Sequence, residues 1–238
     1  MIVTIHQPEH LPWLGFFDKV RQADVYVILD NTQFRKNYFQ NRNKIRTKSG
    51  WSWVVIPVLK DPTETLINEI LTADKPRLKR KYVNLIGQHY FHAEFFETYF
   101  PPLKQILERN HVKLVDLNIE LIKFLLKELG IETDILVASE LGLPKAKGGT
   151  EVNFDICKKL DADVYLSGIS GKEYLDESKF AESGIKVMYQ EFYHPIYQQL
   201  YEPFIPCMSV IDLLFNHGKS SLEIMKGIGV RRMDKLFL

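Results

Sequence analysis

Two short apolar runs near the N-terminus restrict the fold of this chain more than any other feature. Residues 2–5 lead into His6 and residues 25–29 lead into Asp30, so each run ends on an ionisable side chain. Between them, residues 13–21 carry apolar side chains at helical spacing. A strand, a helix and a second strand in this order predict a parallel pair joined by a right-handed crossover.

The same alternation continues along the chain. Apolar runs predict five more strands, at residues 53–58, 68–71, 134–138, 163–167 and 186–190. Helical periodicity dominates from about residue 75 to about residue 130. We therefore expect one α/β domain over residues 1–238, with a mostly parallel, Rossmann-like sheet and the helical segment as an insertion or cap. At the switch point of this sheet, the first strand should end beside the strand at 134–138.

Composition and charge exclude several classes of protein. The formal net charge is +1, so no global field attracts nucleic acid, and we expect no nucleic-acid partner. No stretch approaches the roughly 20 apolar residues that a membrane span requires. The N-terminal residues lack the cationic flank of a signal peptide. We expect a cytoplasmic protein in which Cys157 and Cys207 are too few for a disulfide framework and Cys157 is a reduced, buried thiol.

A basic segment, which we expect to be a loop, follows the second strand. Six cations and no acidic residue lie between Asn31 and Ser49, namely Arg35, Lys36, Arg42, Lys44, Arg46 and Lys48. Ligands of open α/β sheets collect at the carboxyl ends of the strands, where His6 and Asp30 are expected. The combination predicts an anion-binding site. The alternative is a solvated basic loop.

Two glycine-containing segments add further candidate ligand residues. Gly148, Gly149 and Thr150 precede a predicted helix, and Ser167-Gly168-Ile169-Ser170-Gly171-Lys172 leaves the strand at 163–167. Backbone N–H groups and hydroxyls in such turns can surround a phosphate, although ordinary tight turns use the same residues. Neither segment has the spacing of a Walker loop, and the first strand–helix turn lacks a G-x-G-x-x-G fingerprint.

A loop rich in proline, aromatic and polar residues lies at about residues 189–201. It contains His194, Tyr197 and Gln199. Its proline content argues against a core helix, and such a loop can line a pocket for a sugar or a base. We expect His194 and Tyr197 at the rim of one cavity that also contains His6, Asp30, Ser167 and Lys172.

The histidines give no metal signature. Pro8 separates His6 from His10, so these two rings cannot share a helical face as the zinc-protease histidines do. No cysteine partners a histidine at zinc-finger spacing. We expect no dedicated metal site, and the sequence identifies no cofactor.

Six segments resemble, in order, the successive motifs of the WbqC-like proteins. They are HQPEHLPWLGFFDKV, ADVYVILD, NRNKIR, YLSGISGKEYLD, YHPIYQQ and SVIDLLFNHG, and the resemblance extends from Ile2 to Gly218. The motif residues that carry over are His6, Gln7, Pro8, Trp13, Asp30, Lys36, Asn41, Arg42, Ser167, Gly168, Gly171, Tyr174, His194, Tyr197, Gln199, Asp212 and Asn216. The pattern of residues itself adds His10 as a catalytic candidate, and Arg46, Ser170 and Lys172 as ligand-binding candidates. His10 stands where the family's motif H-Q-P-x-Y usually has tyrosine.

The resemblance implies a cytoplasmic enzyme of surface-polysaccharide (O-antigen) biosynthesis that acts on an activated, nucleotide-linked amino sugar. The leading hypothesis is a transferase of acyl or aminoacyl groups. His6 would be the general base, since imidazole titrates near neutral pH. Asp30 would orient His6 or the acceptor, and Lys36, Arg42 and Arg46 would bind phosphate or carboxylate.

Two alternatives stay open. The first is a nucleotide-activating enzyme similar to the HIGH-type nucleotidyltransferases, in which imidazoles stabilise a phosphate transition state by charge. The second is a non-catalytic ligand-binding protein of a polysaccharide assembly pathway. The sequence identifies neither the sugar, nor the donor, nor the oligomeric state.

Overall fold

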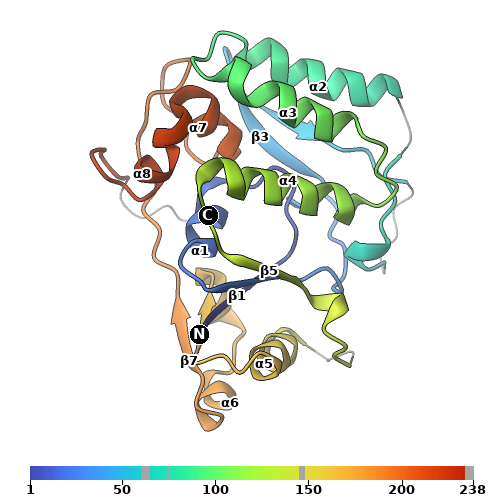
Figure 1. The fold of residues 1–238 in the computed structure, drawn as a ribbon, viewed down its shortest axis with the longest axis vertical. Coiled ribbons are helices and arrows are strands. Elements are labelled where there is room, and N and C mark those ends of the chain that lie inside the picture. The colour runs from blue at the N-terminus through green and yellow to red at the C-terminus, as the bar shows by residue number, and fades with distance from the viewer. Residues whose placement is uncertain (60–64, 74–75, 145–147, 234–238) are drawn as a thin grey trace.

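The structure is a computed structural model that describes residues 1–59, 65–73, 76–144 and 148–233. Its centre is a five-stranded parallel sheet in the order β5-β2-β1-β6-β7 (Figure 1). The strands are β1 (Ile2–His6), β2 (Val25–Ile28), β5 (Asp134–Val137), β6 (Val164–Ser167) and β7 (Lys186–Tyr189). The expected α/β class with a parallel, Rossmann-like sheet is confirmed.

One face of the sheet is covered by α1 (Leu14–Val20), whose residues are all buried. Its apolar side chains join Tyr26 and Ile28 of β2 in the larger hydrophobic core. His6 is the register partner of Ile28, and alternate residues of a strand point to opposite faces. The His6 side chain therefore lies on the α1 face of the sheet.

The opposite face is covered by α5 (Gly149–Lys159) and α6 (Glu177–Glu182) (Figure 1). A smaller core joins these helices to the sheet through Val3, Ile5, Val27, Phe154, Tyr165 and Phe180. Ser167 follows Tyr165 by two positions in β6, so its side chain points to the same face as that core.

An antiparallel hairpin stands apart from the main sheet. It consists of β3 (Arg42–Thr47) and β4 (Gly50–Val55). Ile45 and Val54 belong to the larger core on its inner face. The basic segment, expected to be a loop, is thus partly a strand. Residues 42–45 alternate between partly exposed and buried positions, as residues of a strand do. The high density of charged residues made this pattern hard to recognise in the sequence.

The remaining α-helices lie on the same side of the main sheet as α1 and the hairpin (Figure 1). They are α2 (Pro76–Tyr90), α3 (Phe96–Glu108), α4 (Leu114–Leu129), α7 (Val210–His217) and α8 (Ser221–Met225). Short 3₁₀ turns lie at Ile67–Glu69, Ala138–Glu140, Ile169–Glu173 and Gly218–Ser220. The helical segment expected at about 75–130 corresponds to α2, α3 and α4, and residue 75 itself lies outside the described residues.

Three expectations about the sheet are wrong. β1 lies between β2 and β6, and β5 pairs with β2 instead of β1. The run at 53–58 contributes to the hairpin. Residues 68–71 contain the end of a 3₁₀ turn and an isolated bridge from Leu71 to Lys113. A local apolar pattern indicates that a segment is buried, but it does not indicate which segment packs or pairs with it. That partner depends on long-range packing.

Candidate functional site

The carboxyl ends of β1 and β6 form the topological switch point of the sheet. The chain passes from β1 to β2 on one side, while β6 pairs with β1 on the other. Ligands of open α/β sheets bind in the crevice outside this point. His6 ends β1 and Ser167 ends β6, so these two candidates lie at the same edge of the sheet, on opposite faces.

One ring nitrogen of His6 contacts Glu9, and the other has no hydrogen-bond partner among the described residues. Its Nε2 lies 3.3 Å from Oε1 of Glu9, and its ring packs 5.1 Å from the ring of Phe16. The side chain keeps 30% of its exposure. Among the described residues, Nδ1 is buried and has no hydrogen-bond partner. Because Glu9 accepts from Nε2–H, the lone pair lies on Nδ1, which is the nitrogen free to take a proton.

Glu9 and Lys19 complete a buried ionisable group with His6. Glu9 is 4% exposed and Lys19 is 3% exposed. The Lys19 Nζ donates to the backbone oxygen of Ile5 over 3.2 Å. A Cβ placed on Gly168 would lie 4.0 Å from the same Nζ, so the ammonium sits between the ends of β1 and β6. We call His6, Glu9 and Lys19 the switch-point cluster.

Burial and charge set the protonation states of the switch-point cluster. Desolvation and the Lys19 ammonium lower the pKa of His6, while the hydrogen bond and charge of Glu9 oppose this shift. Desolvation lowers the pKa of Lys19 to about 8 against the attraction of Glu9. At neutral pH His6 is therefore a neutral imidazole and Lys19 is mostly protonated. A neutral base beside a buried cation can accept a proton and stabilise a developing negative charge.

Sequence reasoning missed Glu9 and Lys19. Both lie within the quoted motif HQPEHLPWLGFFDKV, but charged residues beside prolines or in a short helix usually face solvent. Gly15, Asp18 and Lys19 share one side of α1, so its sequence has the pattern of an amphipathic helix with an exposed polar face. This side is buried through contacts with the rest of the fold, and the sequence contains no signal for that burial.

Asp30 has a structural position and does not orient His6. Its Oδ1 accepts from the backbone N–H of Ser139, and its Oδ2 accepts from the Ser139 hydroxyl at 2.6 Å and from Asn68 Nδ2 at 3.2 Å. These bonds connect the end of β2 to the turn after β5 and to the turn at Ile67–Glu69. The expected role of Asp30 beside His6 is therefore corrected, because both carboxylate oxygens are already engaged.

His10 is also a structural residue. It is fully buried, with Nδ1 2.9 Å from Asn118 Oδ1 and Nε2 2.7 Å from the Tyr82 hydroxyl. Burial lowers its pKa to about 4, so the ring is neutral. Because both nitrogens bond to α4 and α2, His10 is not a catalytic candidate.

Arg46 holds the hairpin together and does not face a ligand. It is 1% exposed, and its guanidinium donates to backbone oxygens of Thr47, Gly50, Tyr201 and Pro203. These carbonyls occupy the donors that an anion would need. The expectation that Arg46 binds phosphate or carboxylate is therefore corrected.

The residues expected at the rim of the cavity form buried networks instead. The Tyr197 hydroxyl and Gln199 Nε2 donate to Oδ2 of Asp212, and Tyr90 donates to its other oxygen. His194 is fully buried, with Nδ1 near the oxygen of Pro195 and Nε2 accepting from the backbone N–H of Cys207. His194, Tyr197 and Gln199 therefore stabilise the C-terminal segment.

The candidate residues at the end of β6 and after it do not form one site, because some are buried and others are exposed. The Ser167 hydroxyl donates to the oxygen of Gly168, and the exposed Lys172 lies 5.0 Å above the Tyr189 ring. Ser170 is exposed, Gly171 is buried, and Tyr174 is 54% exposed. Of these ligand candidates, Gly168 is the one that adjoins Lys19.

The remaining candidates lie between β1 and the hairpin. Gln7 donates to Thr32 and accepts from Gln40, and Asn41 donates to the oxygen of Ile56. Trp13 packs against Phe192 and His194. Lys36 is exposed, and Arg42 lies over Trp53 on the hairpin.

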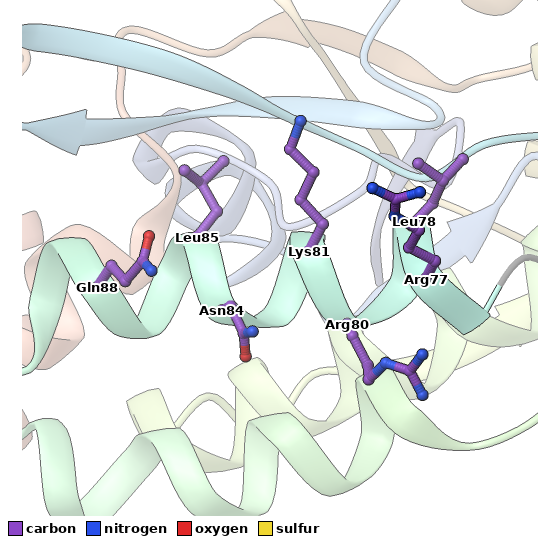
Figure 2. Close-up of a pocket in the computed structure, with 7 residues that line it drawn as sticks. All are labelled: Arg77, Leu78, Arg80, Lys81, Asn84, Leu85 and Gln88. Atoms are coloured by element: carbon purple, nitrogen blue, oxygen red, sulfur yellow. The ribbon is translucent and has the colours of Figure 1, made fainter.

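Two surface cavities lie away from the switch-point cluster. One, of about 610 Å³, runs along α2, and Figure 2 shows its lining side chains, Arg77, Leu78, Arg80, Lys81, Asn84, Leu85 and Gln88. The other, of about 510 Å³, lies at the opposite edge of the sheet, beside Asp24 and Asp134. Neither contains any candidate from the sequence. The first has no residue converging on it from a second element, which a specific ligand site requires.

Comparison with known proteins identifies the family. The WbqC-like protein family matches residues 7–224. The chain is also 32% identical over 228 residues to Uncharacterized protein Rv1507c of Mycobacterium tuberculosis (strain ATCC 25618 / H37Rv), covering 94% of this chain and 97% of that protein. No solved structure matches the chain. Within the described residues, no helix is long and apolar enough to cross a membrane.

Proposed function

We propose, from the premise that the chain belongs to the WbqC-like protein family, that it is a cytoplasmic transferase. It moves an acyl or aminoacyl group onto an activated, nucleotide-linked amino sugar in surface-polysaccharide (O-antigen) biosynthesis. The main support for the proposal is His6 at the switch point of the sheet, where Glu9 holds the ring through Nε2 and the buried Nδ1 has no hydrogen-bond partner among the described residues. A buried acceptor without a partner, at the place where α/β proteins bind ligands, is the feature expected of a general base.

The proposed step needs one proton acceptor and one stabilised oxyanion. The amine nitrogen of the sugar attacks the carbonyl carbon of the donor and gives its proton to His6 Nδ1. The bond from that carbon to the donor's leaving group then breaks, and the leaving atom takes the proton back from His6. The Lys19 ammonium, beside Gly168, supplies positive charge toward the carbonyl oxygen or a substrate phosphate.

The hydrogen bonds of His10 favour the transferase hypothesis over the hypothesis of nucleotide activation. A mechanism of the HIGH type uses imidazoles in pairs against the phosphates. Here the ring of His10 is bonded on both nitrogens to Asn118 and Tyr82. Of these two histidines, His6 is the one with a ring nitrogen that has no hydrogen-bond partner among the described residues, which suits a single proton transfer.

A transfer assay tests this proposal. Purified protein is incubated with nucleotide-linked amino sugars and with acyl or aminoacyl donors, and the products are followed by mass spectrometry. We expect a product heavier than the sugar by one acyl group. His6→Ala should lower kcat by roughly a hundred-fold or more, because a positioned general base contributes about that much.

His92→Ala is the matched control, since His92 is an exposed histidine on the surface of the helical segment. It should leave kcat unchanged. Release of pyrophosphate from a nucleoside triphosphate would point instead to nucleotide activation. Full in vivo function of a folded His6→Ala variant would contradict any catalytic role and favour the non-catalytic alternative.

A further inference from the structure

The outer face of the β3–β4 hairpin carries a row of aromatic rings. The centroids of Trp51 and Trp53 are 5.5 Å apart, Trp53 lies 6.1 Å from Phe39, and Phe39 lies 5.4 Å from Tyr38. Cations accompany these rings along the row. We call the set the basic–aromatic strip, and it consists of Arg35, Tyr38, Phe39, Arg42, Lys44, Trp51 and Trp53.

The cations of the strip lie over rings and not beside carboxylates. The guanidinium carbon of Arg42 is 4.1 Å from the ring centroid of Trp53, and Lys44 Nζ is 5.0 Å from that of Trp51. In the part of the chain that the structure describes, neither cation forms an ion pair with a carboxylate. The Arg42 guanidinium donates to two oxygens of Asn37, and its Nε is buried without an acceptor. A cation held over a ring keeps its full charge, so the strip attracts anions.

A solvated hairpin face is the simpler explanation, and two features argue against it. Ordinary surfaces mix both signs of charge, whereas no acidic residue lies between Asn31 and Ser49. Large rings are also exposed at both ends of the strip, with Tyr38 at 41% and Trp51 at 45%. Exposed rings beside cations that no carboxylate neutralises are typical of surfaces that bind bases and phosphates together.

The order of groups along the strip matches one class of ligand. An exposed ring at each end is separated by Arg42 and Lys44. A nucleoside diphosphate-linked sugar has the same order, with a flat base, two charged phosphates and a second ring. Base stacking suits an indole face, and arginine's planar fork suits phosphate oxygens.

The Tyr38 end of the strip adjoins the switch-point cluster. The backbone N–H of His10 donates to the oxygen of Phe39 over 2.8 Å. The side chain of Gln40 donates to Gln7 over 2.8 Å, and burial, followed by the charge of Glu9, raises the pKa of Tyr38. Trp51 lies at the other end, next to the turn of the hairpin. A ligand along the strip thus has one end near His6.

We infer that the basic–aromatic strip is the nucleotide subsite of this protein. The base stacks on Trp51, the diphosphate binds Arg42 and Lys44, and the sugar at Tyr38 faces His6. This inference rests on the proposed function, because it orients the sugar of the proposed substrate toward the proposed base.

Calorimetric titration with UDP, GDP, ADP, dTDP and inorganic diphosphate tests the subsite. Arg42→Ala and Lys44→Ala should each lower the affinity for the tightest-binding nucleoside diphosphate by about ten-fold, and the affinity for inorganic diphosphate by the same factor. Trp51→Ala should lower the affinity for the nucleoside diphosphate by about ten-fold and leave the affinity for inorganic diphosphate unchanged. With the matching UDP-, GDP-, ADP- or dTDP-linked sugar as probe, Tyr38→Ala should remove the extra affinity conferred by the sugar.

Lys48→Ala and Phe91→Ala are the matched controls, an exposed lysine at the hairpin turn and a ring that is 56% exposed on the helical segment. Both should bind like the wild type. Absence of binding by all four nucleoside diphosphates would overturn the inference, and so would equal affinities in Trp51→Ala and the wild type. Tighter binding of single-stranded RNA than of any nucleoside diphosphate would assign the strip to nucleic acid instead.

The subsite and the proposed function can fail separately. If the strip variants lose nucleotide affinity but no group transfer is detected, the subsite stands and the transferase proposal falls. If His6→Ala abolishes transfer while the strip variants keep wild-type affinity, the transferase stands and the subsite is wrong.

Discussion

Three histidines of this chain have different roles because their surroundings differ. In His6 at the edge of the sheet, Nε2 lies next to Glu9, and the buried Nδ1 has no hydrogen-bond partner among the described residues. His10 and His194 are fully buried, and both nitrogens of each ring have hydrogen-bond partners. The sequence presents all three as polar residues in proline-rich segments. Only packing separates the candidate base from the two structural rings.

Acidification should weaken the fold through the two buried histidines. Burial lowers the pKa values of His10 and His194 to about 4 in the folded protein, whereas the unfolded chain titrates near 6.5. Between these values the unfolded state binds more protons. The free energy of unfolding is therefore highest above about pH 6.5 and falls toward pH 4, by on the order of 3 kcal/mol per histidine. Urea unfolding at a series of pH values measures this slope.

His10→Gln removes one of the titrating groups, so the free energy of unfolding should depend less steeply on pH in this variant. His92→Gln alters an exposed histidine and should leave it as in the wild type. If His10→Gln and His194→Gln both kept the wild-type slope, acid sensitivity would have to come from other groups.

At the scale of elements, the β3–β4 hairpin departs most from the sequence-based expectation. Its basic residues indicated a ligand loop, yet Arg46 is buried and clamps the hairpin to the segment that contains Tyr201 and Pro203. Arg42 and Lys44, on the same strand, remain beside exposed rings. A charge pattern alone does not tell which cation of a strand a later segment will cover.

Arg46→Ala should destabilise the protein without a direct effect on ligand affinity. Four backbone carbonyls would lose their buried donor, and we expect the free energy of unfolding to fall by roughly 3 kcal/mol or more. Arg46→Lys should restore only part of this loss, because an ammonium cannot reproduce the planar fork. Denaturant unfolding measures both variants.

Lys48→Ala removes a cation from the same hairpin at an exposed position and should change stability by no more than about 0.5 kcal/mol. Wild-type stability in Arg46→Ala would show that the hydrogen bonds from Arg46 to the backbone carbonyls do not contribute to the free energy of unfolding.

At the scale of the whole molecule, the sequence predicted the sheet better than the site. The strands β1, β2, β5, β6 and β7 could be predicted because each is a short apolar run between turn residues. Their order could not, because the pairing of β5 with β2 depends on packing between distant segments. The position of His6 at the edge of the sheet could be predicted, because it follows a short apolar run. Glu9 and Lys19 could not, because burial of a charge follows from the assembled fold.

The central claim is that His6 acts as a proton acceptor within the switch-point cluster. Glu9 raises the pKa of His6 and Lys19 lowers it, so removing each partner should shift that pKa in opposite directions. In the proposed mechanism the neutral imidazole is the active form, so the rate should fall at low pH along a limb that reports the His6 pKa.

The pH dependence of kcat/KM in the wild type, Glu9→Gln and Lys19→Met tests this claim most directly. The acid limb should move to lower pH in Glu9→Gln, where the ring loses its stabilising carboxylate, and to higher pH in Lys19→Met, where it loses a repelling ammonium. An acid limb that stays at the same pH in all three proteins would contradict the claim, because the titrating group would then lie outside the switch-point cluster.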